Sequence, residues 1–144
     1  MHRRPLGRGR TLAVVAALVV AVGCLLPWYT IGGEVTGIPA RSVNAFGNLA
    51  GLVTFLSALA VLALVALPYA AGDQPVGVDR WPAYLLLLGV GVIGVAVTVF
   101  QIVTGDLLLE GFRPDRAPGI WITLVGLAIV ARAVFEIAQE PERR

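Results

Sequence analysis

The chain has 144 residues, of which 58% are hydrophobic and only 14% are charged. Soluble domains are about 45–50% apolar and about 25% charged, so this composition excludes an ordinary soluble domain. The net charge of +2 is too small to indicate nucleic acid as a partner, and the single cysteine excludes an internal disulfide.

Uncharged windows divide the chain into four apolar segments. Three of them, 11–33, 42–72 and 81–105, hold 23, 31 and 25 residues, against about 20 for a membrane-spanning helix. The fourth window, 117–131, holds 15 residues and continues past Arg132 if that side chain reaches the interface. Backbone groups in hydrocarbon must pair within their own segment, which favours helices.

We therefore predict an all-α fold, an integral membrane four-helix bundle that forms one domain over 1–144. The predicted helices lie near 11–27, 45–70, 82–104 and 118–138, with short tails at 1–10 and 139–144.

The first predicted helix leads into CLLPWYTIGG, residues 24–33. Pro27 stops the helix. Trp28 and Tyr29 follow where the chain leaves the bilayer, because rings with an apolar body and a polar edge favour the interface. The Gly-Gly pair at 32–33 stands between short β-prone pieces, as in a two-residue hairpin turn. We expect a small hairpin on the outer side of the membrane.

Cys24 allows a second interpretation of the same stretch. A basic N-terminus, an apolar run and the letters AVGC are typical of a lipoprotein signal, which is cut before the cysteine and lipidated on it. The apolar LLPW that follows argues against this, since mature lipoproteins usually begin with a polar tether. We favour an uncleaved helix with a buried Cys24, and the lipidated form stays open at this point.

The second and fourth apolar segments are similar to each other. GLVTFLSALAVLA at 51–63 aligns with GIWITLVGLAIVA at 119–131, with five identities in 13 positions. A duplicated two-helix unit would relate the two halves by an axis along the membrane normal. Shared composition explains the match equally, so the duplication remains one of two explanations.

Small residues recur in the first three segments. GVGVIG at 89–94 has the letters of a dinucleotide-binding fingerprint, but it lies inside an uncharged span with no strand before it. Helices in lipid pack closely through small residues, and we assign these glycines to that role, either within the bundle, which we favour, or between subunits. Four-residue spacings predict the same packing at Ala13/Ala17/Ala21, Gly47/Gly51 and Gly94/Thr98.

The segment 104–119, TGDLLLEGFRPDRAPG, holds five of the twelve charged residues outside the tails. It is either a solvated loop held by its own ion pairs or a contact site for a partner or a lipid headgroup. In the second case the arginines face phosphate and the carboxylates face a cation. The residues of this candidate contact site are Asp106, Glu110, Arg113 and Arg116.

Arg132 and Glu136 lie one turn apart on the fourth predicted helix. A charge inside a span marks a functional candidate, although Arg132 can also reach the interface and pair with Glu136 at i,i+4. We predict an intramembrane ion pair. The chain shows no pairing of a nucleophile with a base, so we expect no catalytic residue, no cofactor and no metal.

Arginine placement predicts the orientation. Eight arginines fall on the side of the two termini and three on the other side, which predicts cytoplasmic termini. Trp81 and Trp121, like Trp28 and Tyr29, are expected to anchor the chain at the interfaces. The basic residues are all arginine, and Ala, Gly, Val and Leu are abundant, which indicates a GC-rich bacterium and its inner membrane.

Three stretches resemble a group of small bacterial four-helix membrane proteins that is common in actinobacteria. They are LLPWYTIGG, FGNLAGLVTFLSALAVL and GIWITLVGLAIV. In that group a first helix ends in Leu-Pro-Trp and a short Gly-rich outer loop leads to the second of four helices. The resemblance implies the fold and no particular activity. CLLPW also resembles the end of the first helix in claudin-type proteins, but the short first loop lacks their cysteine pair.

These features predict a multi-pass protein of the lipid bilayer that works by contact. The expected function is a non-enzymatic accessory, assembly or scaffold subunit, with another membrane protein or a second copy as its partner. The alternative is a homo-oligomer for permeation or small-solute handling, with a path between subunits. That alternative predicts a role for Arg132 or Gln101 in the path.

Overall fold

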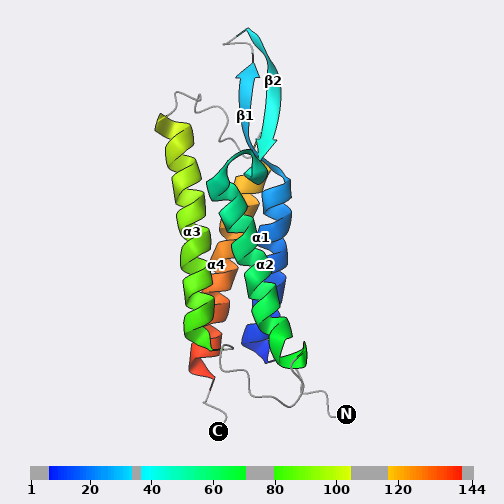
Figure 1. The fold of residues 1–144 in the computed structure, drawn as a ribbon, viewed down its shortest axis with the longest axis vertical. Helices are drawn as coiled ribbons and strands as arrows, with labels where there is room; N and C mark the ends of the chain where they lie inside the picture. The colour runs from blue at the N-terminus through cyan, green and yellow to red at the C-terminus, as the bar shows by residue number, and fades with distance from the viewer. Residues whose placement is uncertain (1–6, 34–36, 71–79, 105–116, 141–144) are drawn as a thin grey trace.

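The structure is a computed structural model that describes residues 7–33, 37–70, 80–104 and 117–140. In this part the chain forms four helices, one 3-10 turn and a two-stranded sheet (Figure 1). The elements in chain order are α1 (Arg8–Leu25), β1 (Pro27–Gly33), β2 (Ile38–Asn44), η1 (Ala45–Gly47), α2 (Leu49–Ala70), α3 (Trp81–Thr104) and α4 (Pro118–Gln139).

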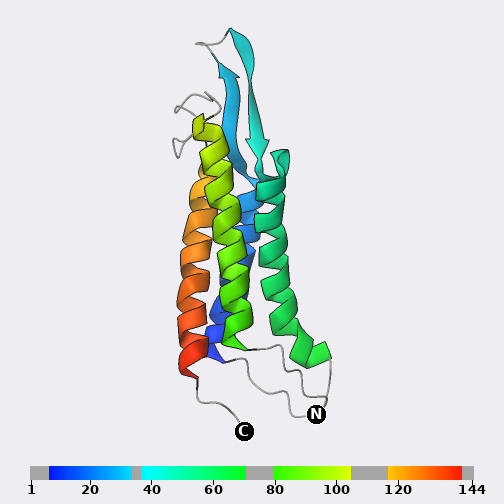
Figure 2. The ribbon, with the colours of Figure 1, turned by 60° about the vertical axis from the view of Figure 1, so that its left-hand side comes forward.

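The four helices run alternately up and down along one long axis (Figures 1 and 2). Each contains a stretch of 18 to 24 residues that is long and apolar enough to cross a membrane. The prediction of four such helices is confirmed. The hairpin of β1 and β2 extends beyond one end of the bundle, and the first turn of α1 and the last turn of α4 lie at the other end (Figure 1).

Two helix boundaries differ from the prediction for local reasons. α1 ends at Leu25, because the residue before a proline is disfavoured in helical conformation and Leu26 is extended with φ −80° and ψ 161°. α2 begins at Leu49 rather than near 45. The side chain of Asn48 accepts a hydrogen bond of 2.7 Å from the Gly51 backbone N–H, which is a helix N-cap.

Small residues let α1 and α4 approach closely. Buried small residues recur every seven positions on both helices, at Gly9, Ala16 and Gly23 on α1 and at Gly119, Gly126 and Ala133 on α4. A Cβ atom at Gly119 would lie 2.6 Å from the Gly23 carbonyl oxygen. The two backbones are therefore in direct contact, which is the packing expected for helices in lipid.

α2 packs mainly on α3 through hydroxyl groups and glycines. The Thr54 hydroxyl donates to the Gly91 carbonyl oxygen at 3.3 Å, and the Thr98 hydroxyl donates to the Asn48 side chain at 3.2 Å. Of the glycines predicted for packing, Gly91 and Gly94 face α2, which confirms their role. Gly89 has open space where a Cβ would stand, so it makes no close contact within this chain, and its packing against a second copy stays a prediction.

The remaining small-residue predictions agree with the structure in part. Ala13 and Ala17 are fully buried, and Ala21 is half-buried. Gly47 ends η1 rather than lying on a helix, and a Cβ on Gly51 would collide with the Ala45 carbonyl group of η1, so this pair does not bring two helices together. The likeness of α2 and α4 as a duplication stays a prediction, because similar helices arise from composition as well.

The hairpin is present, but its turn is not where the sequence indicated. β1 and β2 are antiparallel, with Tyr29 opposite Val43 and Ile31 opposite Arg41. Gly32 and Gly33 lie inside β1, with φ of 88° and 125°, rather than at the turn. A Cβ on Gly32 would lie 2.7 Å from the Pro39 carbonyl oxygen. The two glycines therefore allow an irregularity in the pairing of the strands, and the residues that connect β1 with β2 come after them in the chain.

Candidate functional site

The base of the hairpin is fixed to the bundle by two consecutive aromatic residues. Alternating strand residues normally point to opposite faces, but Trp28 and Tyr29 are both buried. The register explains this, because Pro27 pairs with Asn44 and Tyr29 with Val43, which leaves Trp28 as an extra residue in β1. A β-bulge of this kind bends a strand and re-aims its side chains.

Trp28 also closes the end of α1. Its indole Nε1 donates a hydrogen bond of 3.0 Å to the Gly23 carbonyl oxygen, and the side chain is 0% exposed. The last carbonyl groups of a helix have no partner within the helix, so Trp28 satisfies one of them. Trp28 and Tyr29 are both buried in the protein, and their place at the membrane interface stays a prediction. Trp81 and Trp121 are about half exposed.

Beyond this base the hairpin is open to its surroundings. Residues 38–42 of β2 are all exposed, and Ile38 keeps 61% of its surface accessible. Ile31 and Arg41 face each other across the strands and are exposed as well. A two-stranded sheet has two edges with unpaired backbone groups. Among the described residues, the hairpin therefore presents an exposed β2 strand and exposed apolar side chains above a buried base.

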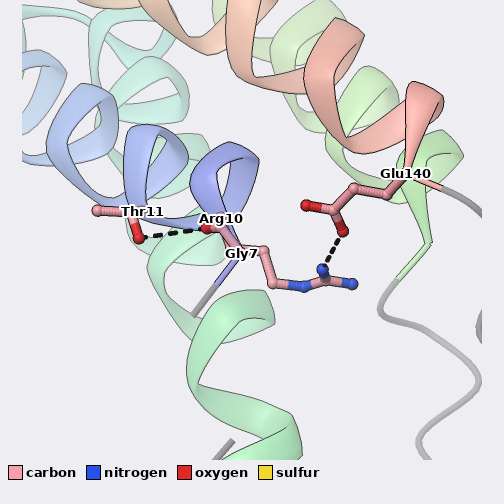
Figure 3. A network of polar contacts seen from close by, with 4 residues as sticks. All are labelled: Gly7, Arg10, Thr11 and Glu140. Carbon is pink, nitrogen blue, oxygen red and sulfur yellow. Dashed lines mark hydrogen bonds and ion pairs between the residues drawn. The ribbon is translucent and has the colours of Figure 1, made fainter. Parts of the chain in front are cut away.

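The opposite end of the bundle carries an ion pair between α1 and the end of α4. Arg10 Nη1 donates to Glu140 Oε2 at 2.6 Å, and both side chains are about three-quarters buried (Figure 3). The Thr11 hydroxyl donates to the Gly7 carbonyl oxygen at 3.2 Å in the same turn. The contact joins residues that are 130 positions apart in the chain.

Glu140 lies against the first turn of α1. A Cβ atom on Gly7 would come within 2.5 Å of the Glu140 Oε1 atom, so the carboxylate rests on this backbone. A helix N-terminus carries partial positive charge, and a carboxylate placed there is stabilised by about 0.3–1 kcal/mol. The helix terminus and the Arg10 guanidinium therefore both hold the Glu140 carboxylate in place.

Next to this ion pair lies an open cleft of about 530 Å³, which we name the charged cleft. Its lining residues come from the start of α1 and the last turns of α4, and they are Gly7, Arg8, Gly9, Arg132, Glu136, Gln139 and Glu140.

Arg132 and Glu136 form the ion pair that the sequence indicated. Arg132 Nε donates to Glu136 Oε1 at 3.2 Å, with 65% of the arginine and 26% of the glutamate side chain exposed. The guanidinium carbon stands 5.9 Å from the centre of the exposed Phe135 ring. The depth of the pair in a membrane stays a prediction. The structure adds that both residues face the charged cleft.

The structure brings only some of the predicted residues together. The candidate contact site of the segment 104–119 lies outside the described residues; its members are Asp106, Glu110, Arg113 and Arg116. Cys24 is buried beside Thr123 of α4, as expected for an uncleaved helix.

Sequence reasoning missed the Arg10–Glu140 ion pair. Arg10 was counted in a basic tail and Glu140 in the C-terminal tail, because the predicted helices began and ended further inside. Extending both helices by one turn would have placed these opposite charges at the same end of the antiparallel pair α1 and α4.

Comparisons with protein-family models, with curated proteins and with solved structures give no match to this chain.

Proposed function

We propose that this chain is a multi-pass protein of a bacterial inner membrane, with both termini in the cytoplasm, that acts as an accessory or assembly subunit. On this proposal the bundle holds the hairpin at the outer surface, where it contacts a partner membrane protein. No chemistry is assigned to the chain itself.

The mounting of the hairpin is the observation that supports this function most. Trp28 and Tyr29 at the base of the hairpin are buried, while Ile31 and Ile38 further along the strands expose apolar surface. Isolated two-stranded hairpins are marginally stable, so anchoring one to a bundle gives a defined surface. An exposed sheet edge accepts an extended segment of a partner through main-chain hydrogen bonds.

Hydrogen bonds inside the bundle agree with a scaffold. The buried Thr54 hydroxyl donates to the Gly91 carbonyl oxygen of α3, and the buried Thr98 hydroxyl donates to the side chain of Asn48 at the start of α2. These hydrogen bonds stabilise the contact of α2 with α3.

The test is purification from the native host in mild detergent, comparing wild type with Ile38→Asp. A foreign partner should copurify with wild type and be reduced at least tenfold for Ile38→Asp, because a carboxylate in an apolar contact is costly to desolvate. Ser42→Asp is the matched control, since it adds the same charge to an exposed position of the same strand. Equal loss in both variants would contradict an apolar contact through Ile38.

One observation favours the homo-oligomeric alternative. Gln101 is an exposed polar residue on α3, next to the exposed Phe100. The same purification separates the two proposals. A discrete homo-oligomer without a foreign partner, with solute flux that is lost in Gln101→Leu, would replace the accessory function by permeation.

A further inference from the structure

We propose that the charged cleft binds the headgroup of a phospholipid that carries a primary amine. In this site Arg132 holds the phosphate, Arg8 adds positive charge at the outer end of the cleft, and Glu136 accepts hydrogen bonds from the ammonium. The inference rests on the proposed membrane location and is independent of the hairpin and its partner.

The charges of the cleft fit a zwitterion better than a simple anion. Arg8 is exposed at one side, and Arg132 has 65% of its side chain exposed. Both give the cleft positive charge that attracts a phosphate. Glu136 and Glu140 line the same cleft, and their carboxylates would repel a second negative charge. A phosphate with an attached ammonium satisfies both kinds of group.

The order of the residues along α4 matches the order of groups in such a headgroup. Gln139 ends the helix; Glu136 lies three residues before it and Arg132 seven. At about 1.5 Å per residue, these positions are roughly 4 and 10 Å from the helix end. The interfacial layer on each side of a bilayer is about 5–8 Å thick. Glu136 therefore lies within the interfacial layer, and Arg132 lies just below it, from where its long side chain reaches back to the phosphate.

The neighbours of Arg132 favour a lipid over a free solute as the ligand. Phe135 is exposed beside the guanidinium, and an exposed ring on a spanning helix packs against acyl chains and glycerol. The ion pair with Glu136 is made by Nε of Arg132. A guanidinium has five N–H donors, so a phosphate can be bound while the contact with Glu136 persists.

A primary amine is selected over a quaternary one by hydrogen bonding. An ammonium group has N–H donors for the Glu136 carboxylate, and a trimethylammonium group has none. Charge-assisted hydrogen bonds are the stronger class. We therefore expect phosphatidylethanolamine to bind about tenfold more tightly than phosphatidylcholine with the same acyl chains.

The experiment is a lipid titration of the delipidated full chain in detergent, followed by native mass spectrometry. The probes are dioleoyl phosphatidylethanolamine, phosphatidylcholine and phosphatidylglycerol. Wild type should prefer the first, Glu136→Gln should bind the first two equally, and Arg132→Gln should bind all three more weakly. Arg41→Gln is the control, because it removes an exposed arginine at the other end of the molecule.

Two results would overturn the lipid site. One is equal binding of the first two lipids by wild type; the other is an ethanolamine preference that persists in Glu136→Gln. Circular dichroism shows whether each variant is folded. If Arg132→Gln does not fold, the lipid preference of Glu136→Gln alone tests the site. Membrane integration is tested separately by resistance to alkaline extraction. A chain that integrates without discriminating these lipids contradicts this site and leaves the proposed function standing.

Discussion

At the scale of single residues, Trp28 belongs to a predicted membrane-exit motif and also caps the end of α1 within the protein. The sequence indicated an aromatic ring at the interface, and the structure places the ring inside the protein with its Nε1 on the Gly23 carbonyl oxygen. The aromatic type and the helix end at Pro27 were predictable. The bulge that turns Trp28 inward depends on the register with β2, which no local pattern encodes.

Removing only the indole donor tests this capping role. Trp28→Phe keeps an aromatic ring and leaves the Gly23 carbonyl oxygen unpaired in a buried place, so we expect a loss of about 1–3 kcal/mol in the free energy of unfolding. Trp81→Phe is the control, because the Trp81 ring is about half exposed. Unfolding in mixed detergent micelles measures both, and equal stability of the two variants would refute the cap.

The two interpretations of Cys24, an uncleaved helix and a cleaved lipoprotein, predict different mature proteins. Cleavage before Cys24 would separate most of α1 from the hairpin, although α1 packs on α4 along buried residues from Gly9 to Gly23. The burial of Cys24 against Thr123 of α4 therefore favours the uncleaved helix.

At the scale of helices, the contact of α1 with α4 depends on small residues repeated every seven positions. The sequence analysis looked for four-residue spacings and found Ala13 and Ala17, which are buried. It missed the repeat of Gly9, Ala16 and Gly23, because a repeat becomes meaningful only with a partner repeat on the facing helix. In a chain rich in Ala and Gly, many spacings occur, and packing decides which of them are used.

Two glycine substitutions separate packing from composition. A Cβ at Gly126 would lie 2.6 Å from Val20 Cγ2 and 2.9 Å from the Val20 backbone nitrogen, whereas Gly89 has nothing within 4 Å. Gly126→Ala should destabilise the fold by about 1–3 kcal/mol through overpacking. Gly89→Ala should be neutral or stabilise it by about 0.4–1 kcal/mol, because alanine restricts the unfolded chain.

Chemical denaturation of the two variants in the same detergent makes the comparison. A loss of stability in Gly89→Ala as large as that in Gly126→Ala would mean that Gly89 meets a second copy of the chain. That result would favour the homo-oligomeric alternative.

At the scale of the whole molecule, the two ends of the bundle differ in chemistry. One end has Arg8, Arg10 and Arg132 around the charged cleft, and the other has the hairpin with Arg41. Segment lengths and the absence of charge predicted the four helices, because hydrocarbon imposes both requirements on every span. The pairing of the helices was beyond such patterns, since all four are apolar on most sides and lipid does not select a partner.

Cysteine labelling tests how these ends lie across the membrane. The natural Cys24 is fully buried, so it should not react with a maleimide in the folded chain and can serve as the silent background. Arg41→Cys should react with a membrane-impermeant maleimide in intact cells, because β2 is exposed. Gln139→Cys, at the opposite end of the bundle, should react only after the membrane is permeabilised. The arginine bias predicts this asymmetry, and the reverse pattern of labelling would place the hairpin in the cytoplasm and the charged cleft in the outer leaflet.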